Sequence, residues 1–252
     1  MEVGYPTGTV PDSPVETLYE NFEFGCKRDP DAPCLGRRKP LQGGGSFADK
    51  YSWLSYAQVQ ELRNAVGSYL RQEHFSTVRS ELKSVGLYSI NRPEWVIVEQ
   101  ACNAYSLVSV ALYDTLGRET ISYVINHSSL SIVFTTRDKL ANLLSISKET
   151  SCLKTIVCMD NDVDGDNQGE PARGDGNEKP RKRYDATSFD SLASQWASDR
   201  KVKLVPWSSV VCKGRKNPLP CVPPRPSDLA SICYTSGTTG TPKGAILSHS
   251  YP

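Results

Sequence analysis

Hydroxyl, glycine and lysine residues are concentrated in one short stretch near the carboxyl end of the sequence. From Ile232 to Lys243 it reads Ile-Cys-Tyr-Thr-Ser-Gly-Thr-Thr-Gly-Thr-Pro-Lys. Glycine lets a backbone come close to a ligand, and successive backbone N–H groups in a turn can surround an anion. Hydroxyl groups add donors and a lysine adds positive charge, so the stretch suits a polyphosphate. The predicted phosphate-binding residues are Thr235, Ser236, Gly237, Thr238, Thr239, Gly240 and Lys243.

Two other interpretations of this stretch are a Walker A loop and an ordinary surface turn. A Walker A loop requires Gly-x4-Gly-Lys-Ser/Thr, but Gly237 and Gly240 are too close together and Pro242 precedes the lysine. A surface turn between two strands would also be rich in serine, threonine and glycine. Such a turn needs only two or three special residues, whereas here a full run of them occurs in order. We therefore predict a phosphate-binding loop that is not of the Walker type.

The composition is that of an ordinary soluble globular protein. The 252 residues, 38% hydrophobic and 23% charged, allow one large domain or two small ones. The formal net charge of +1 predicts no nucleic-acid-binding face and no polybasic membrane anchor. No apolar run reaches the roughly 18 residues that a transmembrane segment needs. Since the first residues also lack the features of a signal peptide, we expect a cytosol-facing soluble domain.

The cysteines and histidines do not suggest a metal site. None of the eight cysteines belongs to a Cys-x-x-Cys pair, and the three histidines, His74, His127 and His249, are far apart. We therefore expect no zinc site. In the absence of a secretion signal, the thiols are expected to be reduced and mostly buried.

The segments before residue 84 predict two helices and one strand. Apolar residues within 14–28 are spaced along one face of a short helix. Residues 51–54 have the composition of a strand and follow a glycine-rich turn at 43–45. Ser55 and Gln58 match a capping box, which predicts that a second helix begins immediately after this strand.

From residue 84 onward, apolar segments alternate between strand and helix patterns. Pro93 is well placed in the first turn of the first of these helices. Alternating units of this length are typical of a doubly wound sheet, so we predict an α/β fold with a parallel sheet and flanking helices. The predicted strands are residues 85–90, 107–112, 132–134, 155–158, 229–234 and 245–247, and the later helices are 119–127, 139–147 and 189–197.

Two segments interrupt this alternation. Residues 160–184 are crowded with Asp, Asn, Gly, Lys and Arg, which predicts a disordered surface insertion. A metal- or phosphate-binding role for Asp160, Asp162 and Asp164 is the weaker alternative, because the rest of a calcium-binding loop is missing. The prolines within residues 206–227 predict an extended connector.

The chain therefore divides into three parts. Residues 1–159 form an amino-terminal α/β part, and residues 160–184 form the polar insertion. Residues 185–252 contain a helix, the connector and a strand–loop–strand unit that carries the phosphate-binding loop. We expect these parts to belong to one incomplete domain.

The phosphate-binding loop resembles the signature of the adenylate-forming (AMP-binding) superfamily. Every position from Tyr234 to Gly244 fits the pattern Tyr-Thr-Ser-Gly-Thr-Thr-Gly-x-Pro-Lys-Gly. Further segments resemble long-chain acyl-CoA synthetases, and the resemblance extends over nearly the whole chain. These segments are residues 34–38, 51–56, 91–105, 112–117 and 123–127. We expect them to build the sheet, with Trp95 and Tyr105 in the core rather than at an active site.

This resemblance implies a two-step reaction. A long-chain fatty acid attacks the α-phosphate of ATP to give acyl-AMP and pyrophosphate, and the thiol of CoA then displaces AMP. Mg²⁺ would neutralise charge on the phosphates. Residues Thr235 to Gly240 would hold the β- and γ-phosphates, and Lys243 would add charge beside them. His249 matches a family histidine near the acyl substrate, although a packed residue at the end of a strand is an equally good explanation.

The resemblance also implies that part of the machinery lies outside these 252 residues. Family members are more than twice as long, and their later Tyr-Gly-x-Thr-Glu segment does not occur in this sequence. Their ribose-binding aspartate and their small domain with a catalytic lysine have no counterpart either. We therefore expect a truncated chain that is inactive by itself.

Two alternatives remain to a truncated long-chain acyl-CoA ligase. One is another adenylate-forming enzyme, such as an aryl-CoA ligase. The other is a non-enzymatic fragment that binds ATP weakly or associates with a full-length synthetase through an unpaired sheet edge. The family is also compatible with a peripheral location at the endoplasmic reticulum membrane or with the peroxisome, and the chain carries no signal for either.

Overall fold

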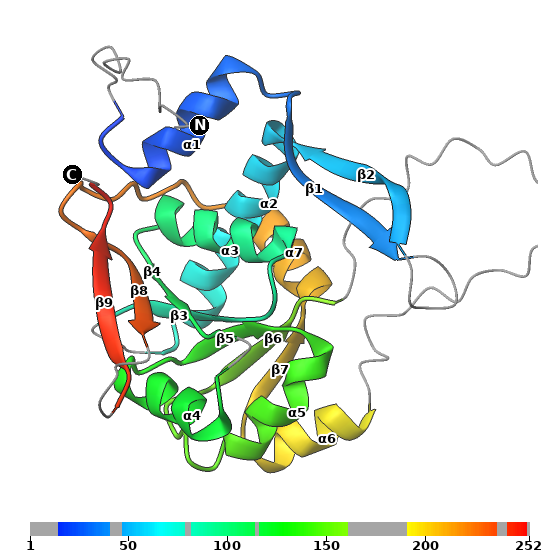
Figure 1. Ribbon diagram of the computed structural model, residues 1–252, viewed down its shortest axis with the longest axis vertical. Coiled ribbons are helices and arrows are strands. Elements are labelled where there is room, and N and C mark those ends of the chain that lie inside the picture. The colour runs from blue at the N-terminus through cyan, green and yellow to red at the C-terminus, as the bar shows by residue number, and fades with distance from the viewer. Residues whose placement is uncertain are drawn as a thin grey trace, which may run out of the picture.

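A seven-stranded sheet runs through the centre of the molecule (Figure 1). The computed structural model describes residues 15–40, 47–78, 82–113, 116–160, 191–235 and 241–250. The strand order is β7-β6-β5-β3-β4-β8-β9, and all neighbouring strands are parallel except β8 and β9. The strands are β3 (Ser84–Tyr88), β4 (Val108–Ala111), β5 (Ile132–Thr135), β6 (Thr155–Cys158), β7 (Lys203–Pro206), β8 (Leu229–Thr235) and β9 (Lys243–Ser248). The predicted α/β fold with a doubly wound sheet is confirmed.

Strand β9 is the antiparallel edge strand of this otherwise parallel sheet. This strand returns antiparallel to β8, with Thr235 opposite Lys243 at the start and Leu229 opposite Ser248 at the end. Only seven residues separate Thr235 from Lys243. A parallel pairing needs a crossover of about a dozen residues or more, so this connection can only form a hairpin.

Helices cover both faces of the sheet (Figure 1). One face carries α1 (Leu18–Arg28), α2 (Tyr56–Tyr69), α3 (Pro93–Ala104) and α7 (Trp207–Lys216). The other carries α4 (Arg118–His127), α5 (Arg137–Ile146) and α6 (Ser191–Asp199). Strand β5 shows how one strand serves both layers, because Ile132 and Phe134 pack into the first core and Val133 into the second. Short runs of apolar residues therefore form strands that are buried on both sides.

Local capping signals decide where the first two helices begin. Ser55 accepts from the backbone N–H of Gln58 at 3.3 Å, and the Gln58 side chain accepts from Ser55 N at 2.8 Å, so the predicted capping box is confirmed. An unpredicted box between Thr17 and Glu20 opens α1. The α2 helix continues into a π-helical turn, η1 (Leu70–His74), which ends with Phe75 N–H donating to the carbonyl of Leu70.

The predicted extended connector over residues 206–227 was wrong in its first half. Strand β7 ends at Pro206, and α7 follows directly from it. Trp207, Val210 and Val211 are buried at helical spacing, and Gly214 completes the stripe. At Gly214 a Cβ would lie 1.8 Å from the carbonyl oxygen of Ala65, so this glycine lets α7 and α2 approach closely. Apart from Pro206 at the N-cap, the prolines of the segment all lie beyond the helix, at positions 218–226.

A separate antiparallel hairpin projects from the first helical layer (Figure 1). It consists of β1 (Pro33–Pro40) and β2 (Phe47–Ser55), which contains the predicted strand 51–54. The glycine-rich turn at 43–45 and most of the predicted insertion, residues 161–184, lie outside the described residues. Within the described ranges, no helix is both long and apolar enough to cross a bilayer.

Candidate phosphate-binding site

The hairpin formed by β8 and β9 carries the predicted phosphate-binding loop. Thr235 is the last residue of β8 and lies directly opposite Lys243, the first residue of β9. The Thr235 hydroxyl donates to the carbonyl oxygen of Lys243 at 3.5 Å. Both residues are exposed, so a hydroxyl and an ammonium group are available at the mouth of the loop. The other five predicted residues, Ser236, Gly237, Thr238, Thr239 and Gly240, lie outside the described residues.

The position of this loop in the sheet suits ligand binding. Strand β8 lies beside β4 and parallel to it, with Ser231 opposite Ser109 and Cys233 opposite Ala111. The loop therefore leaves the sheet at the carboxyl edge of its parallel strands, which is where open α/β sheets bind ligands. No carboxylate in the described part of the chain forms an ion pair with Lys243. An anion beside Lys243 would meet its positive charge directly.

The base of the hairpin contains two residues whose roles were not predicted. Tyr234 is buried, and its hydroxyl lies 2.6 Å from His127 Nδ1 and 2.7 Å from Ser128 Oγ. Gly244 lies opposite Tyr234, and a Cβ there would come within 3.0 Å of Ile232 Cγ2 and 3.3 Å of the Tyr234 ring. Alternate residues along β8 are buried, and this pattern could have indicated that Tyr234 points inward. Its partners could not be identified in this way, because they are more than 100 residues away in the chain.

His249 lies at the opposite end of β9 from Lys243. Six strand positions separate them, which corresponds to roughly 20 Å. The His249 backbone donates to the carbonyl of Asp228, and its ring is buried beside the start of α1, where Leu18 and Pro226 line a hollow of about 520 Å³. Burial lowers the pKa of His249, so the ring is neutral. The structure thus places His249 away from the mouth of the phosphate loop.

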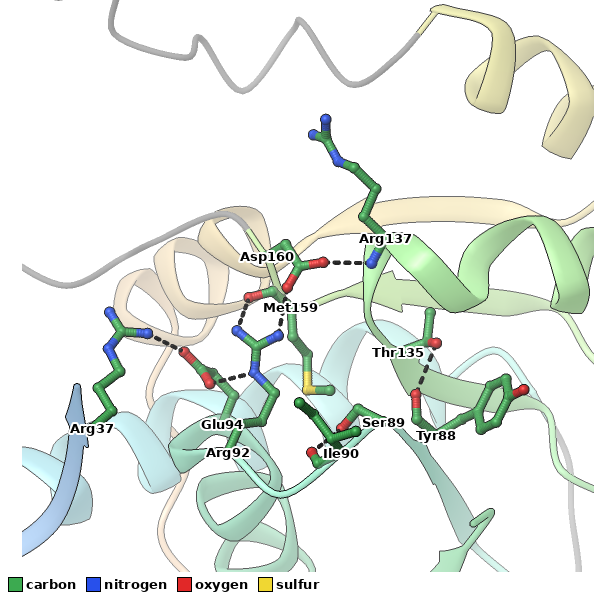
Figure 2. A network of polar contacts seen from close by, with 10 residues as sticks. All are labelled: Arg37, Tyr88, Ser89, Ile90, Arg92, Glu94, Thr135, Arg137, Met159 and Asp160. Atoms are coloured by element: carbon green, nitrogen blue, oxygen red, sulfur yellow. Dashed lines mark hydrogen bonds and ion pairs between the residues drawn. The ribbon is translucent and has the colours of Figure 1, made fainter. Parts of the chain in front are cut away.

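A second hollow, of about 640 Å³, lies at the carboxyl ends of β3, β5 and β6. Figure 2 shows the polar network beside it. Arg92 is its central residue, bonded to Glu94 at 2.6 Å, to Asp160 at 2.5 Å and to the carbonyl of Met159 at 3.1 Å. Glu94 also accepts from Arg37 at 3.2 Å. The two carboxylates offset the charge of Arg92, so we interpret this network as a structural clamp.

The network also gives Asp160 a role that differs from the weaker sequence hypothesis. Its second carboxylate oxygen accepts from the backbone N–H of Arg137, the first residue of α5. An acidic side chain at a helix amino terminus is stabilised by the unpaired N–H groups there. Asp160 therefore holds α5 to the end of β6, while Asp162 and Asp164 lie outside the described residues.

The cysteines and carboxylates form no metal centre among the described residues. All eight cysteines are free, but only Cys26, Cys102 and Cys158 are buried, so the expectation of mostly buried thiols was wrong. Burial raises the pKa of all three thiols above its usual value, so they remain protonated. In the part of the chain that the structure describes, the loop mouth is the best candidate for a binding site, because Thr235 and Lys243 are exposed and Lys243 has no ion-pair partner there.

Comparison with known proteins identifies the family. The family model for AMP-binding enzymes matches residues 22–251. The chain belongs to the AMP-binding enzyme family. This result confirms the resemblance that the phosphate-binding loop and the surrounding segments indicated.

Among relatives, the chain is similar to enzymes that act on long-chain fatty acids. It is 40% identical over 238 residues to human "Long-chain-fatty-acid--CoA ligase 1", covering 93% of this chain and 29% of the relative. It is 38% identical over 240 residues to "Long chain acyl-CoA synthetase 6, peroxisomal" from Arabidopsis thaliana, covering 95% and 29%. The chain thus spans about 29% of the length of these curated relatives.

Solved structures share the fold. The adenylation domain of a carboxylate reductase from Mycobacterium chelonae superposes with a TM-score of 0.73 at 17% identity, over 94% of this chain and 35% of that one. A carboxylic acid reductase didomain from Segniliparus rugosus, solved with AMP, gives a TM-score of 0.71 at 19% identity, over 96% and 32%. At this level of identity the likeness supports the architecture of the sheet and its helices.

Proposed function

We propose that this chain provides the triphosphate-binding loop of an ATP-dependent long-chain fatty acid–CoA ligase. The observation that carries the proposal is the pairing of Thr235 with Lys243, which closes a Ser/Thr/Gly-rich loop at the carboxyl edge of the sheet. The similarity to long-chain-fatty-acid CoA ligases over more than nine-tenths of the chain supports the choice of substrate class.

In the proposed reaction, the carboxylate of a fatty acid attacks the α-phosphate of ATP, forming acyl-AMP and releasing pyrophosphate. The thiol of CoA then forms the thioester and releases AMP. The loop residues Thr235 to Gly240 would bind the β- and γ-phosphates through N–H and hydroxyl donors, and Lys243 would stabilise the charge on them. Their contribution is electrostatic, because none of them forms a covalent bond with the substrate.

Magnesium enters this proposal together with ATP, as the metal complex of the substrate. No group of three or more metal-binding side chains occurs among the described residues. This fits Mg²⁺, which keeps several waters and binds proteins mainly through one or two carboxylates and the phosphates of its substrate. We assign no described residue to CoA.

We further propose that these 252 residues do not complete adenylation by themselves, since they span only about 29% of their relatives. Association with a full-length synthetase is a second proposal. Strand β9 pairs only with β8 in the described structure, and its Ile246 is 64% exposed, as expected for an edge that can receive another strand. Two plant relatives are named as peroxisomal, which supports the peroxisome as the proposed location. A peripheral position at the endoplasmic reticulum membrane is the alternative proposal.

The test is ATP–pyrophosphate exchange with palmitate and Mg²⁺, combined with direct measurement of ATP binding. Wild-type chain is compared with Lys243→Ala and with Lys148→Ala, an exposed lysine after α5 that serves as the matched control. We expect ATP binding that Lys243→Ala weakens and Lys148→Ala leaves unchanged, without exchange above background. Exchange that depends on palmitate and Lys243 would disprove the proposed incompetence. ATP binding that Lys243→Ala leaves unchanged would disprove the phosphate-loop assignment.

A further inference from the structure

Tyr234, the residue that precedes the phosphate-binding loop, forms hydrogen bonds to the end of α4. Tyr234 points away from the solvent, and its hydroxyl lies between Nδ1 of His127 at 2.6 Å and Oγ of Ser128 at 2.7 Å. His127 is the last residue of α4 and Ser128 is its C-cap. One phenol hydroxyl therefore connects the end of α4 to the end of β8.

The three groups can satisfy one another. A phenol hydroxyl can donate one hydrogen bond and accept others, while histidine and serine can each take either role. Burial raises the pKa of Tyr234 above its usual value, so the hydroxyl keeps its proton. Tyr234 can thus donate to one partner and accept from the other. The short distances are those of well-formed hydrogen bonds, and Tyr234 and Ser128 are buried whereas His127 is exposed.

Aromatic packing fixes the orientation of the histidine. The ring of Tyr123, one helical turn earlier, stacks on His127 with centroids 5.2 Å apart and planes 16° apart. The ring of Tyr234 meets the His127 ring edge to face, at 5.9 Å and 83°. Such stacked and edge-to-face pairs are favourable geometries. The His127 ring is therefore held between Tyr123 and Tyr234.

The backbone of Tyr234 transmits this restraint to the loop. Thr235 follows it directly, and the opposite position in β9 is Gly244, where the absence of a side chain leaves room for the Tyr234 ring. A change in the position of the ring would shift β8 at its last residue and β9 at its second. The side chain of Tyr234 thus packs against Gly244 at the point where both strands meet the loop.

We propose that Tyr234 is a positioning residue for the phosphate-binding loop, and that His127 and Ser128 anchor it from the end of α4. The inference rests on the proposed function for the identity of the ligand, whereas the anchor itself is a property of the described residues. Tyr234 contacts no phosphate in this proposal. It holds the entrance of the loop, where Thr235 and Lys243 pair.

The experiment uses the 252-residue chain with two readouts, the dissociation constant for ATP in the presence of Mg²⁺ and amide hydrogen exchange. Tyr234→Phe removes the hydroxyl and keeps the ring. His127→Phe keeps a ring for stacking on Tyr123 and removes Nδ1, whereas His127→Asn keeps a polar atom near the position of Nδ1. Tyr234→Phe combined with His127→Phe completes a double-mutant cycle.

If Tyr234 positions the loop, Tyr234→Phe and His127→Phe should each weaken ATP binding about 5- to 10-fold, as expected for one lost hydrogen bond. The double variant should bind no more weakly than either single variant, and His127→Asn should recover most of the affinity. Amide exchange should become faster at Thr235 and Gly244 and stay unchanged in α2. A purely structural role would lower thermal stability without this pattern of affinity and rescue.

Failure of the inference can be told apart from failure of the proposed function. If ATP binds and depends on Lys243, but Tyr234→Phe changes neither affinity nor exchange, the positioning role is overturned and the proposed function stands. If the wild-type chain does not bind ATP, the proposed function fails. Faster exchange confined to this hairpin in Tyr234→Phe would then still support the anchor, and unchanged exchange would overturn it.

Discussion

The carboxylate of Glu23 in α1 and the guanidinium of Arg63 in α2 form an ion pair with an N–O distance of 2.6 Å, and the Arg63 side chain is only 2% exposed. The same guanidinium bonds to Asn64 at 2.9 and 3.0 Å and lies 5.1 Å from the centre of the Phe22 ring. A buried arginine therefore holds the first helix against the second.

Removing the carboxylate should destabilise the fold strongly. Glu23→Ala would leave the buried charge of Arg63 without its partner, which we expect to cost about 3 kcal/mol in the free energy of unfolding. Glu61→Ala is the matched control, because it removes a helical glutamate that pairs with an arginine in an exposed position. Glu61 lies on α2 and pairs with Arg215 at 3.0 Å. Loss of that pair should cost less than about 1 kcal/mol. Urea unfolding at pH 7 measures both, and equal losses would contradict this account of Arg63.

Gly214 should tolerate no side chain. A Cβ there would lie 1.8 Å from the carbonyl oxygen of Ala65, so Gly214→Ala must push α7 away from α2. We expect a loss of about 2–3 kcal/mol in unfolding free energy, at the upper end of what overpacking usually costs. Gly117→Ala, where nothing lies within 4 Å, should cost less than about 1 kcal/mol. A similar midpoint of thermal unfolding for the two variants would argue against close packing of these helices.

Signals that act over a few residues predicted most of the elements. The capping box of Ser55 and Gln58 opens α2 as expected, and β6 covers the predicted residues 155–158. The helix α7 was missed because prolines at 218–226 dominated the composition of a segment in which residues 207–216 are helical. Averaging over such a segment hides a short amphipathic helix, even when its apolar spacing is regular.

Contacts between distant parts of the chain could not be predicted from the sequence. The strand–loop–strand unit at Thr235 and Lys243 was predicted, because its two strands are neighbours in the sequence, whereas phosphate binding there stays a prediction. The anchor of Tyr234 at His127 was not, since 107 residues separate them and neither residue type demands the other. The ion pair of Arg63, 40 residues from its partner, is a similar case. Such pairs are determined by how helices pack on the sheet, which no local pattern encodes.

A buried histidine should make stability depend on pH. His74 is buried in the π-helical turn, with Nε2 2.8 Å from Ser131 Oγ and Nδ1 3.3 Å from Thr155 Oγ1. Burial, with a smaller effect of nearby Lys203, lowers the pKa of His74 from 6.5 to about 4. The unfolded chain therefore takes up a proton at higher pH than the folded chain. The contribution of the buried, neutral His74 ring to stability is complete above pH 6.5 and is lost as the pH falls from there toward 4.

The size of this effect follows from linkage. A difference of this size between the folded and unfolded pKa corresponds to about 3 kcal/mol lost by pH 4. His74→Gln keeps polar groups but does not titrate, so the difference in stability between wild type and variant should shrink by about that amount between pH 7 and 4. Urea unfolding across this range gives the difference directly. A constant difference would show that His74 is not the titrating group.

Gly244 connects fold stability with the proposed site. In Gly244→Ala the new methyl group would come within 3.0 Å of Ile232 Cγ2 and 3.3 Å of the Tyr234 ring. Both neighbours can yield by a few tenths of an ångström, so we expect the unfolding free energy to change by less than about 1 kcal/mol. The Tyr234 ring would move, however, and with it the entrance of the loop. Binding of ATP should weaken about 3- to 10-fold.

The control for this variant is Ala245→Ser, at the next position of β9, where the side chain is exposed. It should change neither ATP affinity nor stability. Calorimetric titration with ATP and Mg²⁺, together with thermal unfolding, separates the two effects. A Gly244→Ala variant that binds ATP as tightly as wild type would show that the loop tolerates movement of Tyr234. Loss of both stability and binding would instead indicate that β9 itself fails to pair, because a displaced ring alone leaves the ladder between β8 and β9 intact.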